Sequence, residues 1–300
     1  MKVVAELRRR YRLSVLLKVS GVRRSTFYYT LGKADKDGKN EEIFRQIEEI
    51  YHRNKGRYGY RRILLELANR GYKVNHKKVK RIMSKLGIRG ITPKGKYNSY
   101  KGDQNGTCKN LLLRKSVDEE RHKTIYERDF STTACNQKWT TDVSEFHIAA
   151  GKLYLSPILD MHNREIVAFN VSRSPNFAQT TDMLKKAFGK HGHLEGLILH
   201  SDQGWQYQMR FYQQELEKRG IRQSMSRKGN CLDNSPMENF FGVMKNEMFY
   251  GHEYEFKSLD ELEKAIAAYI EYYNNERITE KTKGLPPILY RQQSLSQLSC

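Results

Sequence analysis

Three acidic residues are candidates for chemistry because each interrupts or follows an apolar segment. Asp142 lies inside the strand-like segment WTTDVSEF, Asp202 directly follows the apolar run LILHS, and Glu238 lies in the first turn of a helix expected after Pro236. A carboxylate removed from water is costly unless it meets a cation. Mg²⁺ prefers carboxylate oxygens and keeps positions for water and phosphate oxygens. The pattern predicts a site for two Mg²⁺ or Mn²⁺ ions that catalyses phosphoryl transfer.

The spacing of these acids is weak evidence by itself. Between Asp202 and Glu238 lie 35 residues, and a chain with 11 Asp and 23 Glu shows about one such pair by chance. Considered by itself, Asp202 could also be a turn residue before Gln203, and Glu238 could be an ordinary negative charge at a helix N-terminus. Lys245, seven residues after Glu238, falls on the same helical face, where it would contact DNA phosphate or lie in solvent.

The elements that must position these acids change character along the chain. Three strands joined by short turns are followed by helices that alternate with two further strands, which predicts a mixed α/β core with a five-stranded sheet. The expected strands are 138–146, 152–160, 165–172, 197–200 and 221–225, and the expected helices are 177–188, 207–219, 237–248 and 259–275. The tyrosines 269, 272 and 273 on the last helix form either part of the core or a partner surface.

The N-terminal third predicts small helical units. Residues 13–19, a Gly-containing turn and a basic second helix indicate a helix-turn-helix over 1–32 or a plain helical hairpin, and the polar segment 33–40 indicates a linker. A second basic helical unit covers 41–90, with Asn75 as N-cap of a helix over 76–86 that Gly87 ends. Its expected DNA contacts, which also fit a solvated basic face, are Arg57, Arg61, Arg62, Lys77, Lys78 and Arg81.

The net charge of +20 is confined to the first part of the chain. Residues 1–130 hold 34 Lys and Arg against 14 Asp and Glu, a surplus of 20, whereas residues 131–300 hold 20 against 20. Because phosphate contacts supply most sequence-independent affinity, this division favours a basic region that binds a polyanion, although a solubilising basic tail would give the same count.

The spacing of the cysteines and the hydropathy of the chain argue against several classes of protein. The four cysteines are scattered, without C-x-x-C or zinc-finger spacing, so neither a disulfide framework nor a structural zinc is indicated. No apolar run of about 18 residues and no leader pattern is present, which argues against the membrane and favours the cytoplasm.

Several long words in this sequence resemble those of the DDE transposases of bacterial insertion-sequence family three, whose catalytic core is similar to retroviral integrase. The words run in the family's order over about residues 130–290, which is far more specific than one acid triad. They are WTTDVSEF, LILHSDQGWQY, SMSRKGNCLDNSPMENFFGVMKNE and YYNNERITEKTKGLPPILY.

The resemblance implies a ribonuclease H-like core, which is expected over 131–250. A linker is expected over 91–130, because its first part is rich in Gly, Pro, Asn and Lys without periodicity, and a C-terminal helical extension is expected over 251–300. The resemblance also implies that Asp142, Asp202 and Glu238 are catalytic metal ligands, that Lys245 contacts DNA, and that the unit over 41–87 is a helix-turn-helix. The loop with Lys228 is assigned to substrate DNA, with a plain Gly/Asn turn as an equal alternative.

The family also implies partners. Cutting and joining require two DNA ends to be held together, so a homo-oligomer on terminal repeats and target DNA is expected. The zinc module of retroviral integrases is missing, so recognition of the repeats would depend on the basic helical region. Family members are often second-frame products fused to an upstream helix-turn-helix and leucine-zipper protein, and the lack of a heptad segment resembles such a product.

Two other functions remain open. A ribonuclease H-like nuclease would share the carboxylates but only hydrolyse, and a non-catalytic DNA-binding protein, such as a domesticated transposase or a transposition repressor, would use the core as a scaffold. Joined DNA products distinguish the first from a transposase, and metal-dependent products of any kind distinguish the second.

Overall fold

The computed structural model describes residues 2–91, 107–118 and 123–298. The chain divides into two compact units, Met1–Gly90 and Ile91–Cys300. Within the described ranges, none of the helices combines the length and apolar character needed to cross a bilayer.

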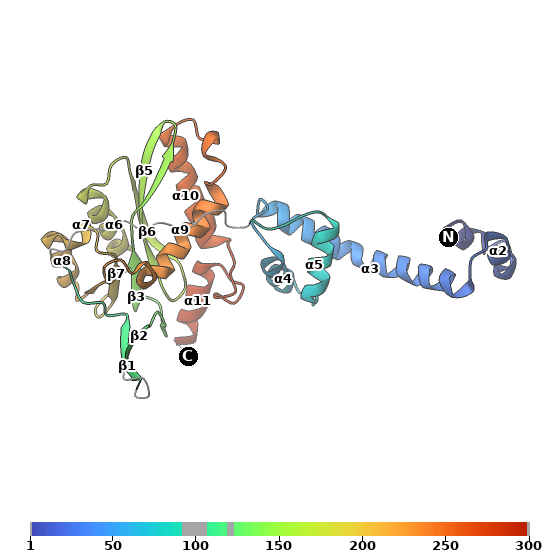
Figure 1. Ribbon diagram of the computed structural model, residues 1–300, viewed down its shortest axis with the longest axis horizontal. Helices are drawn as coiled ribbons and strands as arrows, with labels where there is room; N and C mark the ends of the chain where they lie inside the picture. The colour runs from blue at the N-terminus through green and yellow to red at the C-terminus, as the bar shows by residue number, and fades with distance from the viewer. Residues whose placement is uncertain (1, 92–106, 119–122, 299–300) are drawn as a thin grey trace. The chain divides into compact units, whose positions relative to one another are not determined.

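The first unit is entirely helical. Ile47, Ile63 and Val79 are fully buried where its last three helices pack together, because each helix places apolar residues on one face at helical spacing. Gly71, with φ of +85°, provides the left-handed residue that ends one helix before the next begins. The helices are α1 (Lys2–Leu7), α2 (Leu13–Ser20), α3 (Arg24–Arg53), α4 (Tyr60–Asn69) and α5 (His76–Lys85) (Figure 1).

The predicted linker over 33–40 is wrong. α3 (Arg24–Arg53) runs through it as one continuous helix, joining the two units expected on either side. The segment is polar and aperiodic but contains no proline, and a helix nucleated by its flanks propagates through such residues at small cost. The polar composition of this segment therefore does not mark a break in the backbone.

The second unit is built on a mixed sheet whose strand order is β4-β5-β3-β7-β8, with β6 paired to β5. β3, β4 and β6 pair antiparallel to β5, while β3, β7 and β8 are parallel. The strands are β3 (Lys138–Thr141), β4 (Ser144–Ile148), β5 (Gly151–Asp160), β6 (Ile166–Ser172), β7 (Ile198–Ser201) and β8 (Arg222–Met225).

The five-stranded mixed sheet is confirmed, with one change. The first predicted strand, 138–146, is divided at Asp142 and Val143 into β3 and β4, and both halves pair with β5. Six segments therefore occupy five strand positions, and the division falls at one of the candidate acids.

Helices cover both faces of the sheet (Figure 1). On one face, Trp139, Leu199 and Met183 form a core with α6 and α8. On the other face, the strands pack against α9 and α10, with Tyr269 and Tyr273 buried, so those tyrosines belong to the core. The helices are α6 (Phe177–Lys190), α7 (Trp205–Gln208), α8 (Arg210–Glu217), α9 (Ser235–Met248), α10 (Leu259–Asn275) and α11 (Pro287–Leu298). One predicted helix, 207–219, is thus two short helices, α7 and α8.

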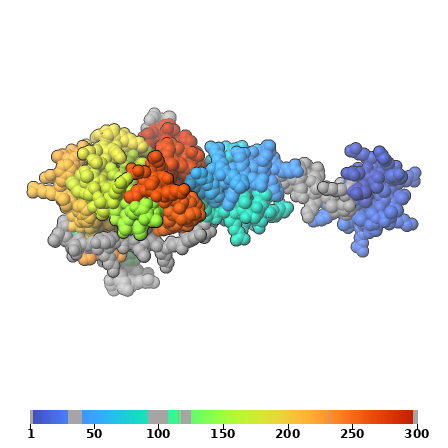
Figure 2. All heavy atoms as spheres, turned by 90° about the horizontal axis from the view of Figure 1, so that it is seen from above, coloured from blue at the N-terminus to red at the C-terminus, as the bar shows by residue number. Residues whose placement is uncertain are grey.

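The C-terminal segment adjoins the turn between β4 and β5. Leu259 at the start of α10 lies 3.5 Å from the position that a Cβ on Gly151 would occupy. The space-filling view shows the corresponding surfaces in contact, with residues near 150 in yellow-green and those near 255 in orange (Figure 2). A larger residue at Gly151 would meet this side chain in a left-handed conformation, with φ of +132°.

The segment over 91–130, expected to be a linker, contains an antiparallel hairpin in its described part. β1 (Leu113–Asp118) pairs with β2 (Lys123–Arg128). The chain before the hairpin lies along the edge strand β8, because the Leu111 N–H donates to Ser224 Oγ at 2.9 Å and Cys108 Sγ donates to Gln223 Oε1 at 3.3 Å. This segment is therefore part of the second unit and covers its sheet edge.

Candidate active site

The two candidate aspartates follow neighbouring parallel strands. β3 and β7 pair in parallel, and Thr140 opposite His200 is the last pair of their ladder. Asp142 lies two residues beyond Thr140, and Asp202 lies two residues beyond His200. Because parallel strands end at the same sheet edge, these equal offsets bring both carboxylates to that edge.

Both carboxylates are partly removed from water. Asp142 is 8% exposed, and its Oδ1 accepts the Val143 N–H at 2.7 Å. Asp202 is half-buried, and its Oδ1 accepts the Gly204 N–H at 2.9 Å. Burial raises the pKa of the Asp202 carboxyl above its usual value, and the Gly204 N–H only partly opposes this. A carboxylate in this setting is stabilised by a cation.

The hydroxyl of one tyrosine lies within electrostatic reach of both aspartates. Tyr207 is wholly buried, and burial and then the charges of Asp142 and Asp202 raise the pKa of its hydroxyl well above 10. Thr141 lowers that pKa slightly, but the Tyr207 hydroxyl makes no hydrogen bond of good geometry within the described ranges. Tyr207 thus forms an uncharged wall close to both carboxylates.

Glu238 lies in the first turn of α9, on a helix whose start is fixed to β3. The Asn234 amide accepts a hydrogen bond from the Thr140 hydroxyl and donates one to the Thr141 carbonyl at 3.2 Å. Asn234 is the residue before α9, and Glu238 is half-buried four residues later. The helix that carries Glu238 is therefore hydrogen-bonded, through Asn234, to β3, the strand that precedes Asp142.

The residues present fit a divalent cation in part. Asp142 and Asp202 supply two carboxylates of the type that Mg²⁺ prefers, at one sheet edge and under a burial cost that a cation would offset. Among the residues that the structure describes, no three His, Cys, Asp or Glu side chains come close enough together to hold one ion. The role of Glu238 as third ligand stays a prediction.

Lys245 is buried, not solvated. It is 9% exposed, its Nζ donates to the Glu145 carbonyl at 2.7 Å, and that nitrogen lies 4.9 Å from the Phe146 ring centroid. Burial lowers the pKa of Lys245, while the charges of Glu145 and Asp142 oppose this. The lysine is therefore within electrostatic reach of Asp142, and its contact with DNA phosphate stays a prediction.

The loop before α9 has an exposed part and a buried part. Lys228 is exposed at its tip, whereas the Asp233 side chain is fully buried and pairs with Arg128 at 2.7 Å and Arg227 at 2.9 Å. Although burial raises the pKa of Asp233, the hydrogen bonds from Arg227 and Arg128 lower it to about 2. Lys228 remains a predicted substrate contact, while Asp233 holds the loop in place.

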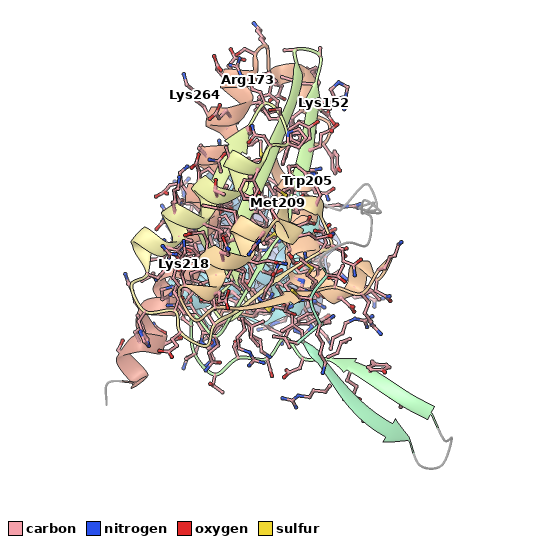
Figure 3. The ribbon with its side chains drawn as sticks, turned by 90° about the vertical axis from the view of Figure 1, so that its left-hand side faces the viewer. Lys152, Arg173, Trp205, Met209, Lys218 and Lys264 are labelled. Atoms are coloured by element: carbon pink, nitrogen blue, oxygen red, sulfur yellow. The ribbon has the colours of Figure 1, made fainter. Side chains whose placement is uncertain are left out.

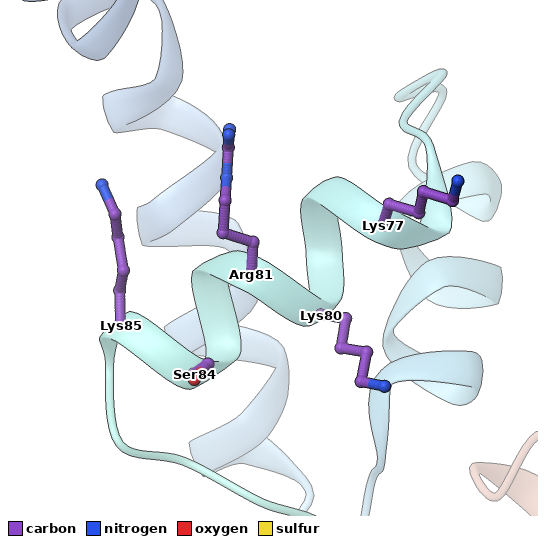
Figure 4. Close-up of a pocket in the computed structure, with 5 residues that line it drawn as sticks. All are labelled: Lys77, Lys80, Arg81, Ser84 and Lys85. Atoms are coloured by element: carbon purple, nitrogen blue, oxygen red, sulfur yellow. The ribbon is translucent and has the colours of Figure 1, made fainter.

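In the first unit, α5 presents its basic residues as expected. The Asn75 side chain caps the helix by accepting the Lys77 N–H at 2.8 Å, which confirms the predicted N-cap. Lys77 and Arg81 are exposed and one turn apart, and Lys78 is half-buried. A shallow pocket on this helix is lined by Lys77, Lys80, Arg81, Ser84 and Lys85 (Figure 4).

Three further arginines predicted to contact DNA flank the start of α4. Arg61 is exposed beside the Tyr60 ring, 5.8 Å from its centroid, and Arg62 lies 5.3 Å from the centroid of the Tyr58 ring. Arg57 is half-buried, and its carbonyl accepts a hydrogen bond from Arg62 at 3.3 Å. Their contact with DNA stays a prediction.

Family models match most of both units. A model described as an integrase core domain matches residues 132–231, a second one with the same description matches 238–295, and an HTH-like domain matches 39–96. The first two matches span the sheet and its flanking helices, and the third spans the second half of α3 together with α4 and α5.

Full-length relatives decide the family. The putative transposase InsK for insertion sequence element IS150 of Escherichia coli strain K12 is 46% identical over 294 residues, covering 98% of this chain and 98% of the relative. The chain belongs to this transposase family. Transposase InsF for insertion sequence IS3A of the same strain is 27% identical over 293 residues, covering 95% of this chain and 96% of the relative.

The family assignment confirms the resemblance to insertion-sequence family three and the ribonuclease H-like fold of this transposase's core. The catalytic core domain of HTLV-2 integrase in complex with magnesium is 18% identical, with a TM-score of 0.40, over 53% of this chain and 97% of that one.

Two residues in the segment after Asp202 were missed by sequence reasoning. Trp205 and Tyr207 lie in the word that contains Asp202. Their positions in this word are the available signal, but only the burial of Tyr207 and the exposure of Trp205 give them meaning.

Proposed function

We propose that this transposase cuts DNA at the ends of an insertion sequence and joins the freed ends to target DNA. The observation that supports this most is the register of β3 and β7, which brings Asp142 and Asp202 to one sheet edge. In hydrolysis, water attacks a phosphodiester and the bond to the 3′ oxygen breaks, leaving a 3′-OH. In joining, that 3′-OH attacks a target phosphodiester and displaces another 3′ oxygen.

The proposed chemistry needs Mg²⁺ or Mn²⁺, held by Asp142, Asp202 and Glu238. Two such ions, when bound, would supply the positive charge that activates an attacking oxygen and stabilises a leaving oxygen in in-line phosphoryl transfer. Tyr207 keeps the inner side of the aspartate pair free of water because it is wholly buried there. Asn234 fixes the start of α9 to β3 and so limits where Glu238 can move.

Lys245 is proposed to hold a phosphate beside the aspartates. Its Nζ is bound to the Glu145 carbonyl, so contact with DNA requires this hydrogen bond to be shared or exchanged. The basic residues Lys77, Lys78, Arg81, Arg57, Arg61 and Arg62 of the helix-turn-helix-like unit, together with Lys228, are proposed to bind the element's terminal repeats and target DNA. We propose that a homo-oligomer holds the two ends, with an upstream-frame helix-turn-helix and leucine-zipper protein as partner.

The test is a cleavage and strand-transfer assay on labelled ends from the element's own flanks, with Mg²⁺. The intact chain should give cleaved and joined products. Asp142→Asn and Glu238→Gln should lower the yield by at least about 100-fold, because each removes a negative ligand charge. Glu263→Gln on the exposed face of α10 makes the same charge change away from the acids and should retain full activity.

Three results would contradict the proposal in different ways. Cleaved products that are never joined would indicate a nuclease. Binding of the ends without any product, even with the upstream-frame partner added, would indicate a non-catalytic DNA-binding protein. Full activity of Glu238→Gln alongside inactive Asp142→Asn would remove Glu238 from the site while leaving the reaction in place.

A further inference from the structure

The two tryptophans of this chain have opposite surroundings. Trp139 is 0% exposed in the core of the second unit, whereas Trp205 is 50% exposed three residues after Asp202. An indole offers a large apolar face that folding normally buries. A half-exposed indole next to a pair of catalytic candidates therefore marks a surface that something else can cover.

The segment around Trp205, which includes the short helix α7, is held in place on both sides. Gln203 donates through Nε2 to the Ser226 carbonyl at 3.1 Å, and Gln208 donates to the Gln203 carbonyl at 2.6 Å. Tyr207, two residues after Trp205, is anchored in the core, and its carbonyl accepts a hydrogen bond from Gln223 at 2.7 Å. The exposure of Trp205 is thus a property of a fixed segment.

Trp205 is followed by a second exposed apolar residue, and its segment is bonded to a loop with an exposed lysine. Met209 is 42% exposed, and Figure 3 labels it beside α7 together with Trp205. The Gln203 hydrogen bond to Ser226 joins this segment to the loop that contains the exposed Lys228. An exposed ring thus lies three residues after Asp202, and its segment is bonded to a loop with an exposed lysine, which suits a base and a phosphate of one nucleic-acid strand.

We propose that Trp205 stacks on a DNA base next to the phosphodiester at Asp142 and Asp202. This inference rests on the proposed function and adds the contact that places the strand. A duplex interior offers no free base face, because every base is stacked on both sides. The partner is therefore a terminal or unpaired base, which an aromatic ring binds whatever its identity.

The two tryptophans make the inference directly measurable in the full chain. Trp139 is buried, so changes in tryptophan emission and in quenching by iodide report on Trp205. The experiment uses Asp142→Asn, which prevents turnover, with two duplexes of equal length. One is linear with an unpaired 3′ nucleotide at each end, and the other is a covalently closed circle that has neither ends nor unpaired bases. Fluorescence anisotropy of the labelled DNA measures binding independently.

Open ends should quench Trp205 and protect it from iodide at concentrations that saturate binding, and closed duplexes should do neither. Trp205→Ala should weaken binding of open ends by about 10-fold, and Trp205→Phe, which keeps a ring, by less. Neither substitution should change the affinity for closed duplex, and Trp205→Ala should lower the melting temperature by no more than a few degrees, since half of the indole is already exposed. Met209→Ala is the matched control for removal of exposed apolar surface and should bind open ends normally.

The inference is overturned if open ends bind fully without changing Trp205 emission, or if Trp205→Ala binds them as tightly as the unsubstituted chain does. It is also overturned if iodide protection rises with protein concentration alone, which would show that a second copy covers the ring. Quenching without any cleavage by the unsubstituted chain would defeat the proposed function and support stacking. Cleavage and joining by Trp205→Ala with unchanged KM and kcat would support the proposed function and defeat stacking.

Discussion

Asp142 and Asp202 lie at one sheet edge, where removal from water lowers the stability of the fold. Burial raises the pKa of Asp202, and Asp142 is buried at the same sheet edge. A carboxyl whose pKa is higher in the folded state than in the unfolded state destabilises the fold as pH rises above the unfolded value, because the folded state holds the charge less favourably. A bound cation would remove this penalty.

At the residue scale, we therefore predict opposite effects of Asp142→Asn on stability and activity. Without metal, the substitution should raise the free energy of unfolding by on the order of 1 kcal/mol, because it removes one of two neighbouring negative charges. Mg²⁺ should raise the melting temperature of the unsubstituted chain by a few degrees and leave that of Asp142→Asn unchanged.

The measurement is thermal unfolding with EDTA and with Mg²⁺. Asp182→Asn on the exposed side of α6 makes the same charge change outside the site and should follow the unsubstituted chain in both conditions. An equal Mg²⁺-dependent rise in all three proteins would show that the ion binds elsewhere.

The sequence predicts the acids of this site better than their supports. Asp142 and Asp202 are recognisable because a carboxylate in or after an apolar strand is unusual, and that signal is local. The burial of Lys245 and of Asp233 depends on Glu145, Arg128 and Arg227, which come from other segments of the fold. No local pattern distinguishes such residues from solvated ones.

At the scale of elements, Asp233 connects the β1–β2 hairpin to the start of α9. Its carboxylate pairs with Arg128 at the end of β2 and with Arg227 after β8, and it accepts a hydrogen bond from Asn110 at 3.1 Å. Asn234, the next residue, is bonded to β3. The position of the helix that carries Glu238 therefore depends on this ion-pair network.

We predict that Asp233→Asn lowers the free energy of unfolding at pH 7 by about 2 kcal/mol. The pKa of Asp233 is lowered from 3.8 to about 2, a difference worth about that much. Arg128 and Arg227 are partly exposed, which keeps the cost below that of a fully buried pair. Because a lowered carboxyl pKa stabilises the fold above the unfolded value, this contribution disappears as pH falls from about 4 to about 2.

Chemical denaturation of the full chain at pH 7 and at about pH 3, between the two pKa values, tests this. The difference between Asp233→Asn and the unsubstituted chain should be large at neutral pH and smaller in acid, while Asp182→Asn should differ little at either pH. A difference that is the same at both pH values would mean that the charge of Asp233 is not what stabilises the loop.

Elements whose sequence has a periodic apolar pattern were predictable, and those without such a pattern were not. α5 has Asn75 as a cap and buries Val79 and Ile82 at helical spacing, so composition and periodicity agree. The middle of α3 has no such pattern, and the β1–β2 hairpin leaves Ile125 and Tyr126 exposed, so neither gives a periodic signal. Their structure comes from flanking elements and strand pairing.

At the scale of the whole molecule, most of the net positive charge lies in the first unit. Residues 1–90 hold 25 Lys and Arg against 8 Asp and Glu, a surplus of 17, whereas residues 91–300 hold 29 against 26, a surplus of 3. Because the core carries little net charge, it attracts DNA phosphates weakly and does not hold DNA in arbitrary orientations. The basic part of the chain supplies affinity through phosphate contacts. Sequence-independent DNA affinity should therefore belong to the first unit.

This division predicts how DNA binding depends on salt. Replacing Lys77, Arg81 and Lys85 on α5 together by Ala should weaken binding of the full chain. It should also flatten the slope of log K against log salt by about 1 for each DNA phosphate that the protein no longer neutralises. Replacing Arg173, Lys218 and Lys264, which are exposed on the second unit, removes the same charge and should leave the slope nearly unchanged (Figure 3). Anisotropy titrations between about 50 and 300 mM salt, roughly the range where phosphate contacts dominate, measure both. Equal slopes for the two triple variants would show that net charge, and not the face of α5, governs binding.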